Sequence, residues 1–374
     1  MNTHLSYWEL KEWLTNIDFT VVGSGIVGLN CALSLKEKYP QSNIIILEKG
    51  VLPSGASTKN AGFACFGSIS ELLDDLKAHS EEEIFQLAGK RWEGLQRLRR
   101  QIGDITLAYQ QHGGYELFLK NDEALIENCF ERINYFNELL QPIFKKEVFI
   151  TSKNRFSFNN VYNNYILNRF EGQLDTGKMM KALLQKAIEK KIKILNGITV
   201  NSFSEDLNSV KVQTNHFDFS SRKLFIATNG FASQLGINDV SPARAQVLIT
   251  KPIEKLQIKG TFHLDKGYYY FRNIDNRILL GGGRNLALKE ETTTTFGQTS
   301  LIQDKLEALL KTAILPKTSF EIEHRWSGIM GIGSQKKPIV KTISNNVFCG
   351  VRLGGMGVAI GAQTGAELAE LANA

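Results

Sequence analysis

The chain has 374 residues, of which 43% are hydrophobic and 22% charged, and its 44 Lys and Arg exceed its 38 Asp and Glu to give a net charge of +6. This length favours two packed domains over a single core. The net charge is small, and the sequence contains no run of like charges typical of a nucleic-acid-binding arm. No apolar run approaches the roughly 18 residues that a membrane span needs.

The cysteines and the N-terminus indicate where the protein works. The four cysteines are scattered without a CxxC pair, which is typical of a reducing compartment. Residues 1–14 are polar, contain two tryptophans and lack the apolar core of a signal peptide. We therefore predict a cytoplasmic protein, with a short helix over residues 7–14 and no membrane span.

Residues 17–48 carry the clearest motif. An apolar strand over 17–22 runs directly into Gly23-Ser24-Gly25-Ile26-Val27-Gly28, a helical pattern follows to residue 39, and a second apolar strand over 43–47 ends at Glu48. Gly23 permits the tight turn, Gly25 lets the backbone approach a pyrophosphate, and Gly28 lets the helix lie close to the sheet. An acid 20 residues beyond the last glycine can reach ribose hydroxyls. The unit predicts a dinucleotide-binding Rossmann-like domain.

The same residues limit which dinucleotide the domain can bind. Glu48 disfavours the 2′-phosphate of NADP, whereas NAD and FAD share this unit. The next loop, residues 55–64, consists mostly of small residues with hydroxyls and an amide. Such a loop can bring backbone N–H groups against a second phosphate and a flat ring, so we predict that it contacts the cofactor.

The middle of the chain mixes helices and strands. Helical patterns cover 70–78, 80–103, 122–140 and 176–190, and residues 154–170 show no clear period. The helix over 80–103 carries a basic cluster, for which a solvated face is favoured over RNA contact: Lys90, Arg91, Arg97, Arg99 and Arg100. Strands are predicted over 115–119, 193–195, 198–203, 210–214, 217–219 and 223–227.

The last third contains a second set of strands. Residues 243–250, 261–264, 268–272 and 277–281 predict an antiparallel sheet, followed by a helix over 299–311 and strands over 320–326, 338–343 and 347–350. A second glycine-rich turn, Gly354–Gly357, opens a C-terminal helix over 358–371. The positive end of that helix suits the electron-rich end of a reduced flavin.

Four stretches, in this order, resemble the D-amino-acid oxidase/glycine oxidase superfamily of FAD-dependent oxidoreductases: GSGIVG…LEKG, GASTKNAGFA, IATNG and RWSGIMG…GVRLGGMGVAIG. The prefix SYW and the loop STKNAGFA are most similar to the gamma-glutamylputrescine oxidase-like branch. The resemblance implies an α/β fold, with a glutathione-reductase-type FAD domain over 1–80, 150–232 and 325–374. A substrate domain with an antiparallel sheet would take 81–149 and 233–324.

The resemblance also assigns residues to a non-covalently bound FAD. The pyrophosphate, ribose, adenine and flavin would lie along the following positions: Gly23, Ser24, Gly25, Ile26, Gly28, Glu48, Lys49, Ser57, Thr58, Asn60, Ala61, Gly62, Val200, Thr228, Asn229, Gly230, Gly354, Gly355, Met356 and Gly357. No metal is implied. Cys349, in a predicted strand, is interpreted as a core thiol rather than as a flavin attachment point.

The chain departs from the family where substrate would bind. Met330 and Gly355 stand where related enzymes carry carboxylate-binding arginines, and Leu279 or Leu280 stands where sarcosine oxidase-like enzymes carry an oxygen-activating lysine. Tyr269 matches an active-site tyrosine. Two interpretations remain open: the substrate is an amine without an α-carboxylate, or another arginine replaces the missing pair. The nearest candidates are Arg352 and Arg272.

These residues lead to one main hypothesis and two rivals. The main hypothesis is oxidation of a C–N bond in a small amine or amino acid by hydride transfer to flavin N5, with oxygen or another acceptor reoxidising the flavin. Tyr269, Arg272, Arg352 and Met330 would orient the substrate. The rivals are a flavin-dependent tRNA-modifying oxidoreductase, in which the basic helix contacts RNA, and a flavin-containing subunit without a substrate of its own.

Overall fold

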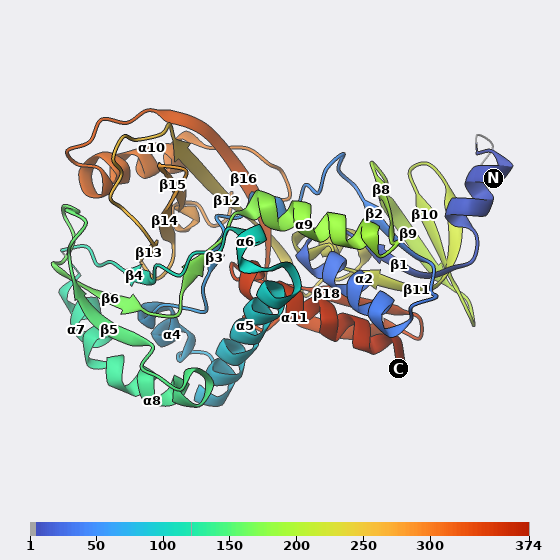
Figure 1. Ribbon diagram of the computed structural model, residues 1–374, viewed down its shortest axis with the longest axis horizontal. Helices are drawn as coiled ribbons and strands as arrows, with labels where there is room; N and C mark the ends of the chain where they lie inside the picture. Colours follow the sequence, from blue (N-terminus) through green and yellow to red (C-terminus); the bar gives the residue numbers. More distant parts are fainter. Residues whose placement is uncertain (1–4, 121, 374) are drawn as a thin grey trace.

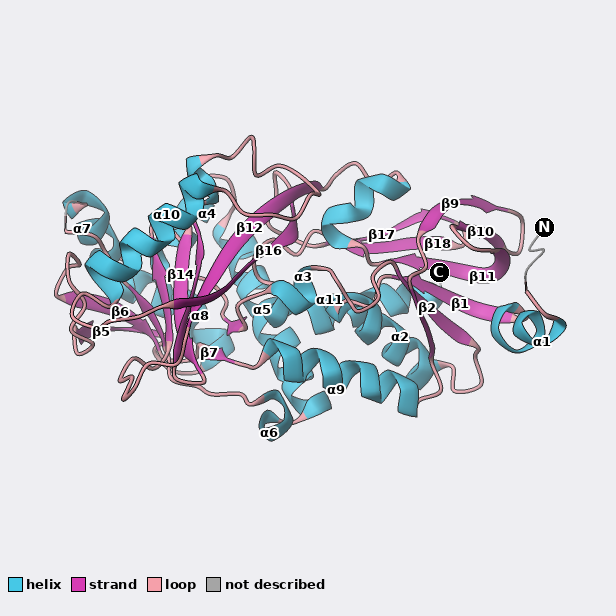
Figure 2. Ribbon diagram, turned by 90° about the horizontal axis from the view of Figure 1, so that it is seen from above, coloured by secondary structure: helices cyan, strands magenta, loops and turns pink. Residues whose placement is uncertain are grey.

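The computed structural model of the protein describes residues 5–120 and 122–373 and has two lobes, each built on one eight-stranded sheet (Figure 1). The lobe that carries the described N-terminal segment and the C-terminus contains the Rossmann-like sheet. The long helices α5 (Glu81–Ile102), α9 (Thr176–Glu189) and α11 (Gly357–Glu370) lie in the middle of the molecule (Figures 1 and 2). The α/β fold with a second sheet domain is confirmed.

The first sheet has a mostly parallel core with the strand order β17-β18-β11-β1-β2-β8, and β10 and β9 extend it from β11. β1 lies centrally and pairs in parallel with β2 and β11. Its strands are β1 (Ile17–Val22), β2 (Ile44–Glu48), β8 (Lys193–Asn196), β9 (Val200–Glu205), β10 (Val210–Thr214), β11 (Asp218–Ile226), β17 (Ile339–Ser344) and β18 (Val347–Val351). All five residues of β2 and of β18 are buried, as apolar runs covered on both faces predict.

Small residues let the helices pack closely on this sheet. α2 (Ile26–Lys38) contacts α11, where a Cβ on Gly365 would lie 2.6 Å from the carbonyl oxygen of Val27. α5 crosses α11 at Gly94, where a Cβ would lie 2.3 Å from the carbonyl oxygen of Ala359. Glycine at these two positions therefore sets the distance between the helices.

Two glycines of α5 predict opposite effects on stability. Gly94→Ala should lower the free energy of unfolding by about 1–3 kcal/mol, because the new methyl group meets the α11 backbone. Gly89→Ala should raise it by up to about 1 kcal/mol, because its Cβ meets only Ile143 Cδ1 at 3.6 Å and alanine favours the helix. Urea unfolding measures both; equal effects of the same sign would contradict this packing.

The second sheet has the order β16-β12-β15-β14-β13-β4-β6-β5 and is antiparallel except where β13 pairs with β4. Its strands are β4 (Gly114–Glu116), β5 (Phe149–Lys153), β6 (Asn164–Asn168), β12 (Ser241–Thr250), β13 (Thr261–Leu264), β14 (Tyr269–Ile274), β15 (Arg277–Gly282) and β16 (Ile322–Ile332). The short strands β3 (Phe63–Ala64) and β7 (Gly172–Gln173) pair separately. One face of this sheet packs on α10 (Ser300–Leu309), and its core includes Phe262, Phe271 and Leu280.

The remaining elements cover the edges and connect the lobes. They are α1 (Tyr7–Glu9), η1 (Leu10–Leu14), α3 (Ala56–Lys59), α4 (Ile69–Asp75), α6 (Asp104–Leu107), α7 (Glu123–Glu131), α8 (Ile133–Phe144), η2 (Asn229–Leu235), η3 (Arg284–Leu286), η4 (Leu310–Ile314) and η5 (Leu371–Asn373). In the part of the chain that the structure describes, no helix combines the length and apolar character needed to cross a bilayer.

Two sequence predictions about the second lobe are wrong in part. The helix predicted over 122–140 is two helices, α7 and α8, broken at Arg132. Residues 149–153 and 164–168 form a hairpin that joins the second sheet through β4, although residues from 150 onward were predicted to lie in the FAD domain. The segment is rich in Asn and aromatics and lacks alternation, so its periodicity did not reveal the strands. β16 likewise stays in the second sheet as far as Ile332, past residue 325, where the FAD domain was predicted to resume. The other domain boundaries remain predictions.

Candidate active site

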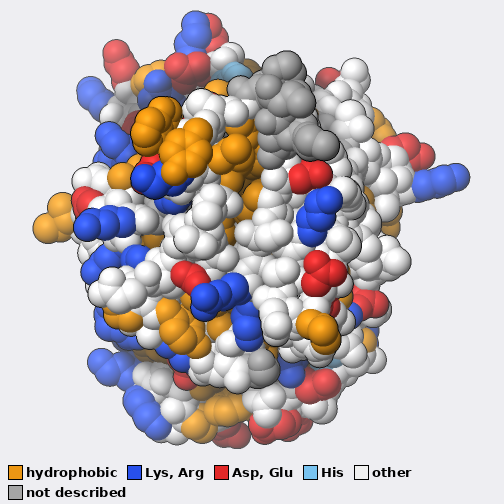
Figure 3. Space-filling model, turned by 90° about the vertical axis from the view of Figure 1, so that its right-hand side faces the viewer, with side chains coloured by type: hydrophobic (Ala, Val, Ile, Leu, Met, Phe, Trp, Pro, Cys, Tyr) orange, Lys and Arg blue, Asp and Glu red, His pale blue; other side chains and the backbone are white. Residues whose placement is uncertain are grey.

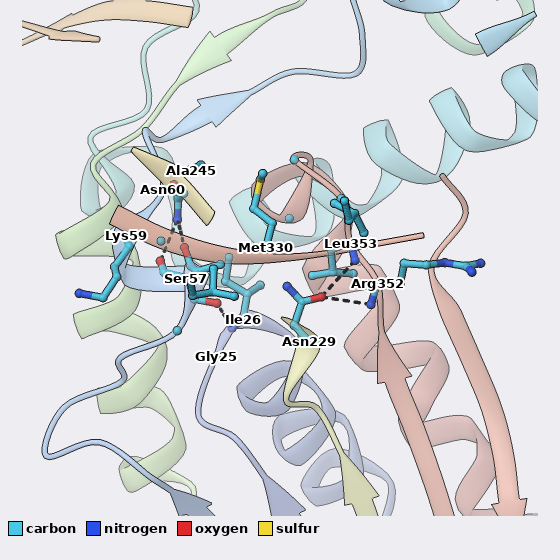
Figure 4. Close-up of a pocket in the computed structure, with 18 of the residues that line it drawn as sticks. Gly25, Ile26, Ser57, Lys59, Asn60, Asn229, Ala245, Met330, Arg352 and Leu353 are labelled. Carbon is cyan, nitrogen blue, oxygen red and sulfur yellow. Dashed lines mark hydrogen bonds between the residues drawn. The ribbon is translucent and has the colours of Figure 1, made fainter. Parts of the chain in front are cut away.

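A cavity of about 990 Å³ runs from the carboxyl ends of β1 and β2 to the face of the second sheet that is turned away from α10. Residues of both lobes line it, among them Gly25, Glu48, Val247 and Tyr270. Figure 4 shows part of its wall, with Gly25, Ser57, Asn229 and Met330 on four separate chain segments. The cavity is therefore large and long enough for an extended cofactor.

The β1–α2 turn has the geometry that phosphate binding requires. Gly23 has a φ of +101°, and a Cβ on Gly28 would lie 1.9 Å from its carbonyl oxygen. Gly25 has no room either, since its Cβ would lie 2.8 Å from Ser57 Oγ. The first N–H of α2, on Ile26, donates to Ser57 Oγ at 2.9 Å. The helix N-terminus thus opens onto the cavity without a side-chain cap from its own Ncap residue.

Glu48 organises the end of the cavity beside this turn. Its Oε2 accepts from the backbone N and the Oγ of Ser24 at 3.1 and 2.7 Å, and its Oε1 accepts from Gly50 N at 2.9 Å. Ser24 itself is buried behind the turn and does not line the cavity. Lys49, Val200 and Thr228 line the same region, as do Ile198 and Thr199.

The loop over residues 55–62 lies between the two lobes. Asn60 Oδ1 accepts from Gly62 N at 2.8 Å and from Thr176 Oγ1 at 2.9 Å, so one amide fixes the end of the loop. Trp326 of the second sheet donates to the carbonyl oxygen of Lys59 at 2.9 Å. Ser57, Asn60 and Ala61 line the cavity. Thr58 and Gly62 do not: Thr58 Oγ1 bonds to the carbonyl oxygen of Pro53, and Gly62 faces Leu174.

Asn229 joins two further segments at the cavity wall (Figure 4). Its Oδ1 accepts from the backbone N of Arg352 at 3.1 Å and of Leu353 at 3.2 Å. This holds the chain just before the turn Gly354–Gly357, whose four residues all line the cavity. Gly230 packs behind, where a Cβ would lie 2.5 Å from the carbonyl oxygen of Met330.

Of the four residues predicted to orient substrate, the structure brings two to the cavity. Met330 and Arg352 line it. The Arg352 guanidinium, however, donates through Nε and Nη2 to the carbonyl oxygen of Lys337 and points away from Met330 (Figure 4). Arg272 is buried behind Gly62, outside the lining, and burial lowers its pKa to about 10 against the charges of Asp175 and Asp275.

Tyr269 lies on the opposite face of β14 from the cavity. It belongs to the core that packs on α10, whereas Tyr270, one residue later, lines the cavity. The tyrosine that faces the cavity is therefore one position beyond the predicted one, because successive residues of a strand point to opposite faces. Tyr270 has room because β15 carries Gly281 opposite it, where a Cβ would lie 2.7 Å from the ring.

Several residues that line the cavity were not predicted from the sequence. Phe63 packs edge-on against both His263 and Tyr270, with ring centroids 5.3 and 5.6 Å apart. Cys65 Sγ lies 3.3 Å from Met356 Sδ. His263 is the cross-strand neighbour of Tyr270 and forms a buried pair with Glu171. Polar and apolar residues alternate along Thr261–Leu264. This pattern could have revealed His263 as a cavity residue, because it places the histidine on the face of the strand opposite Phe262.

The basic cluster of α5 is used within the chain. Arg91 is buried, lines the cavity and donates to the carbonyl oxygen of Phe66 at 2.8 Å. Arg97 bonds Ser34, Arg99 pairs with Asp104 and Lys90 pairs with Glu367. The interpretation of the cluster as a solvated face is thus wrong for Arg91.

All four cysteines are free and buried. Cys349 lies inside β18 and is not part of the cavity wall, whereas Cys65 is. Among the described residues, no group of three or more His, Cys, Asp or Glu is arranged to hold a metal ion.

Acid precipitation of the yellow protein should release its flavin as FAD into the supernatant. The expected reason is that Cys349 is sequestered in the sheet and that burial strongly raises the pKa of Cys65, which keeps it as an unreactive thiol. Absorbance of supernatant and pellet measures this. Colour that stays with the pellet in the natural protein but not in a Cys65→Ser variant would contradict non-covalent binding.

Comparison with known proteins gives one family. The family model described as FAD dependent oxidoreductase matches residues 18–371. A curated relative, "Probable oxidoreductase OrdL" of Haemophilus influenzae, is 22% identical in an alignment that covers 96% of this chain and 83% of the relative. L-proline dehydrogenase from P. horikoshii is similar in structure, with a TM-score of 0.76 and 19% identity over 95% of this chain and 93% of that one.

Glycine oxidase from Bacillus cereus gives a TM-score of 0.77, with 16% identity over 96% of this chain and 95% of that one. At these identities the solved structures confirm the fold, and the family match spans nearly the whole chain. The cradle of Gly23, Gly25 and Gly28 fits the pyrophosphate of the cofactor that this family uses. The chain belongs to the D-amino-acid oxidase/glycine oxidase superfamily of FAD-dependent oxidoreductases.

Proposed function

We propose that this enzyme oxidises a C–N bond of a small amine or amino acid, and that water then hydrolyses the imine. The observation that supports this most is the continuity of the cavity, which extends from the N-terminus of α2 past the loop 55–62 to the second sheet. A cofactor held at the first end leaves the second end for a small substrate. Bound FAD supplies the hydride acceptor at flavin N5.

The proposed cofactor contacts follow the cavity wall. Gly23, Gly25 and the N-terminus of α2 would take the pyrophosphate, Glu48 the ribose and Val200 the adenine. Ser57, Asn60 and the turn Gly354–Gly357 would lie along the flavin half. Ser24, Thr58, Gly28, Gly62 and Gly230 would act from behind, by fixing the segments that carry these contacts.

The part of the substrate end that β3, β14 and β16 form is apolar and aromatic. Met330, Phe63, Tyr270 and Cys65 line it. Hydride transfer needs little acid–base assistance but needs the α-hydrogen held over the acceptor with the amine neutral. Tyr270 and Met330 would position the substrate, and exclusion of water by the apolar wall would favour the neutral amine. Arg352 and Arg272 are less suited to direct contact, since one bonds Lys337 and the other lies behind Gly62.

A tRNA substrate has less support than a small molecule. Lys90, Arg91, Arg97 and Arg99 of α5 bond within the chain. The end of the molecule in Figure 3, which lies at the right of Figure 1, carries Asp and Glu as well as Lys and Arg. RNA retention that falls steeply with salt would favour this alternative. A subunit without its own substrate would instead hold flavin that no amine reduces.

An anaerobic screen tests the proposed function. The FAD-loaded protein is mixed with amines and amino acids in the absence of oxygen, and bleaching of the flavin absorbance is followed. We expect at least one small amine or amino acid to bleach the flavin. Full FAD occupancy with no bleaching by any of them would remove the proposal.

A further inference from the structure

One buried pair of charged residues, His263 and Glu171, lies at the cavity wall, and His263 is the member that lines it. His263 is 5% exposed and Glu171 1%, and Nε2 of His263 lies 2.5 Å from Glu171 Oε1. His263 lines the cavity and its Nδ1 has no hydrogen-bond partner among the described residues. The ring is therefore held by one nitrogen and can offer the other to a ligand.

The surroundings fix this arrangement. Thr261 Oγ1 donates to the same Glu171 oxygen at 2.7 Å, and a Cβ on Gly114 would lie 2.2 Å from the Glu171 carboxyl carbon. Phe63 packs edge-on against the imidazole. Phe63 also brings the pair close to the turn Gly354–Gly357, because Cys65, two residues on, contacts Met356.

The charge on the pair is decided by its neighbours. Burial disfavours the charged imidazole, but the Glu171 carboxylate outweighs burial through its charge and its hydrogen bond, and the pKa of His263 rises to about 9. Two further acids act in the same direction, Glu71 of α4 and Glu116 of β4. Glu116 is occupied by Ser68 Oγ and the N–H groups of Ile69 and Ser70. At neutral pH His263 is therefore a cation whose free N–H borders the cavity.

Five other cations of the cavity wall have contacts of their own, whereas Lys49 and Lys266, which also line it, are exposed to solvent. Lys336 pairs with Asp75, the Arg352 guanidinium bonds Lys337, and Arg91 bonds Phe66. Lys59 lies over the ring of Phe296, and Arg284 over the ring of Tyr268. Tyr270, the neighbour of His263 across the β13–β14 pair, is the adjacent hydroxyl on the same face.

We infer that His263, held by Glu171, binds the carboxylate of the substrate through its Nδ1–H. The inference rests on the proposed function and narrows its substrate class to amines that carry a carboxylate. It replaces the missing arginine fork by a single charge-assisted hydrogen bond. Glu171 has two effects: it keeps the imidazole charged and it turns the free nitrogen toward the cavity.

Binding of a substrate-sized anion tests this without turnover. The FAD-loaded protein is titrated with propionate and with its neutral counterpart propionamide, and the shift in flavin absorbance gives both dissociation constants. At pH 7 propionate should bind at least tenfold more tightly than propionamide. As the pH rises through about 9 the preference should disappear, because the imidazolium loses its proton, while propionamide binding stays level.

Variants separate the two residues. His263→Asn should abolish the preference at every pH. Glu171→Gln should abolish it already at pH 7, because burial without the carboxylate lowers the pKa of His263 below its ordinary value. His324→Asn is the matched control, since His324 is exposed and stacks on Trp326 from the rim of the sheet. It should bind as the natural protein does.

Three results would overturn the inference: no preference for propionate in the natural protein, a preference without a break between pH 7 and 10, or a preference that survives His263→Asn. If it survives there but is lost in Arg91→Lys, the anion belongs to Arg91. The pH profile of the natural protein needs no variant, so a misfolded variant does not remove the test. Failure of the proposed function is separate, because it is measured by flavin bleaching and not by anion binding.

Discussion

Gly25→Val should yield a folded but colourless protein. A Cβ at this position would lie 2.8 Å from Ser57 Oγ, the group that accepts from the first N–H of α2. The valine would displace Ser57 and fill the approach of the pyrophosphate to the helix N-terminus. Losing two charge-assisted hydrogen bonds of about 2 kcal/mol each corresponds to roughly a thousandfold in FAD affinity. The ratio of flavin to protein absorbance after purification measures the effect.

Gly89→Val is the matched control for this variant. Gly89 lies on α5, where a Cβ meets Ile143 Cδ1 at 3.6 Å, and it is not part of the cavity wall. The control should keep its colour. The Gly25 variant should keep the circular dichroism of the natural protein but melt at lower temperature, because bound FAD no longer stabilises the folded state. A Gly25→Val protein that holds flavin normally would show that the pyrophosphate lies elsewhere.

The first lobe was predictable from the sequence because its signals are local. β1, the glycine turn, α2 and β2 follow one another within 32 residues, and each has its own physical requirement. The need for glycine at Gly94 and Gly365 was not predictable. At both positions a side chain would collide with the backbone of a helix that is far away in the chain. The hairpin of β5 and β6 was missed for a related reason: β6 joins the sheet by pairing with β4, where Tyr115 lies opposite Leu167, far along the chain.

Which side chains reach the substrate end of the site is decided by the register of the paired strands and not by a sequence motif. The sequence shows three consecutive tyrosines, and only the pairing of β14 with β13 and β15 decides which of them meets the cavity. The pair of His263 and Glu171 spans 92 positions, so no spacing rule connects the two residues. Met330 was found because it stands inside a recognisable stretch, and it does line the cavity.

Replacing the two tyrosines separately tests this register. Tyr270→Phe should slow the reduction of flavin by substrate by about tenfold or more, which corresponds to roughly 1.4 kcal/mol of lost transition-state stabilisation. Its hydroxyl borders the cavity beside His263 and is available to the substrate. Gly281→Ala should have a similar effect, because its methyl group would lie 2.7 Å from the Tyr270 ring and move it.

Tyr269→Phe is the control on the neighbouring position. Tyr269 packs in the core beside α10, and its hydroxyl has no hydrogen-bond partner among the described residues, so its removal should change the rate by less than about twofold. Single-turnover reduction under anaerobic conditions, with the amine or amino acid that bleaches the flavin, measures all three variants. A large loss in Tyr269→Phe together with a normal rate in Tyr270→Phe would reverse the faces of β14. The wall of the substrate end would then be built from Tyr269 and its strand neighbours, and the pairing of His263 with Tyr270 on one face would have to be abandoned.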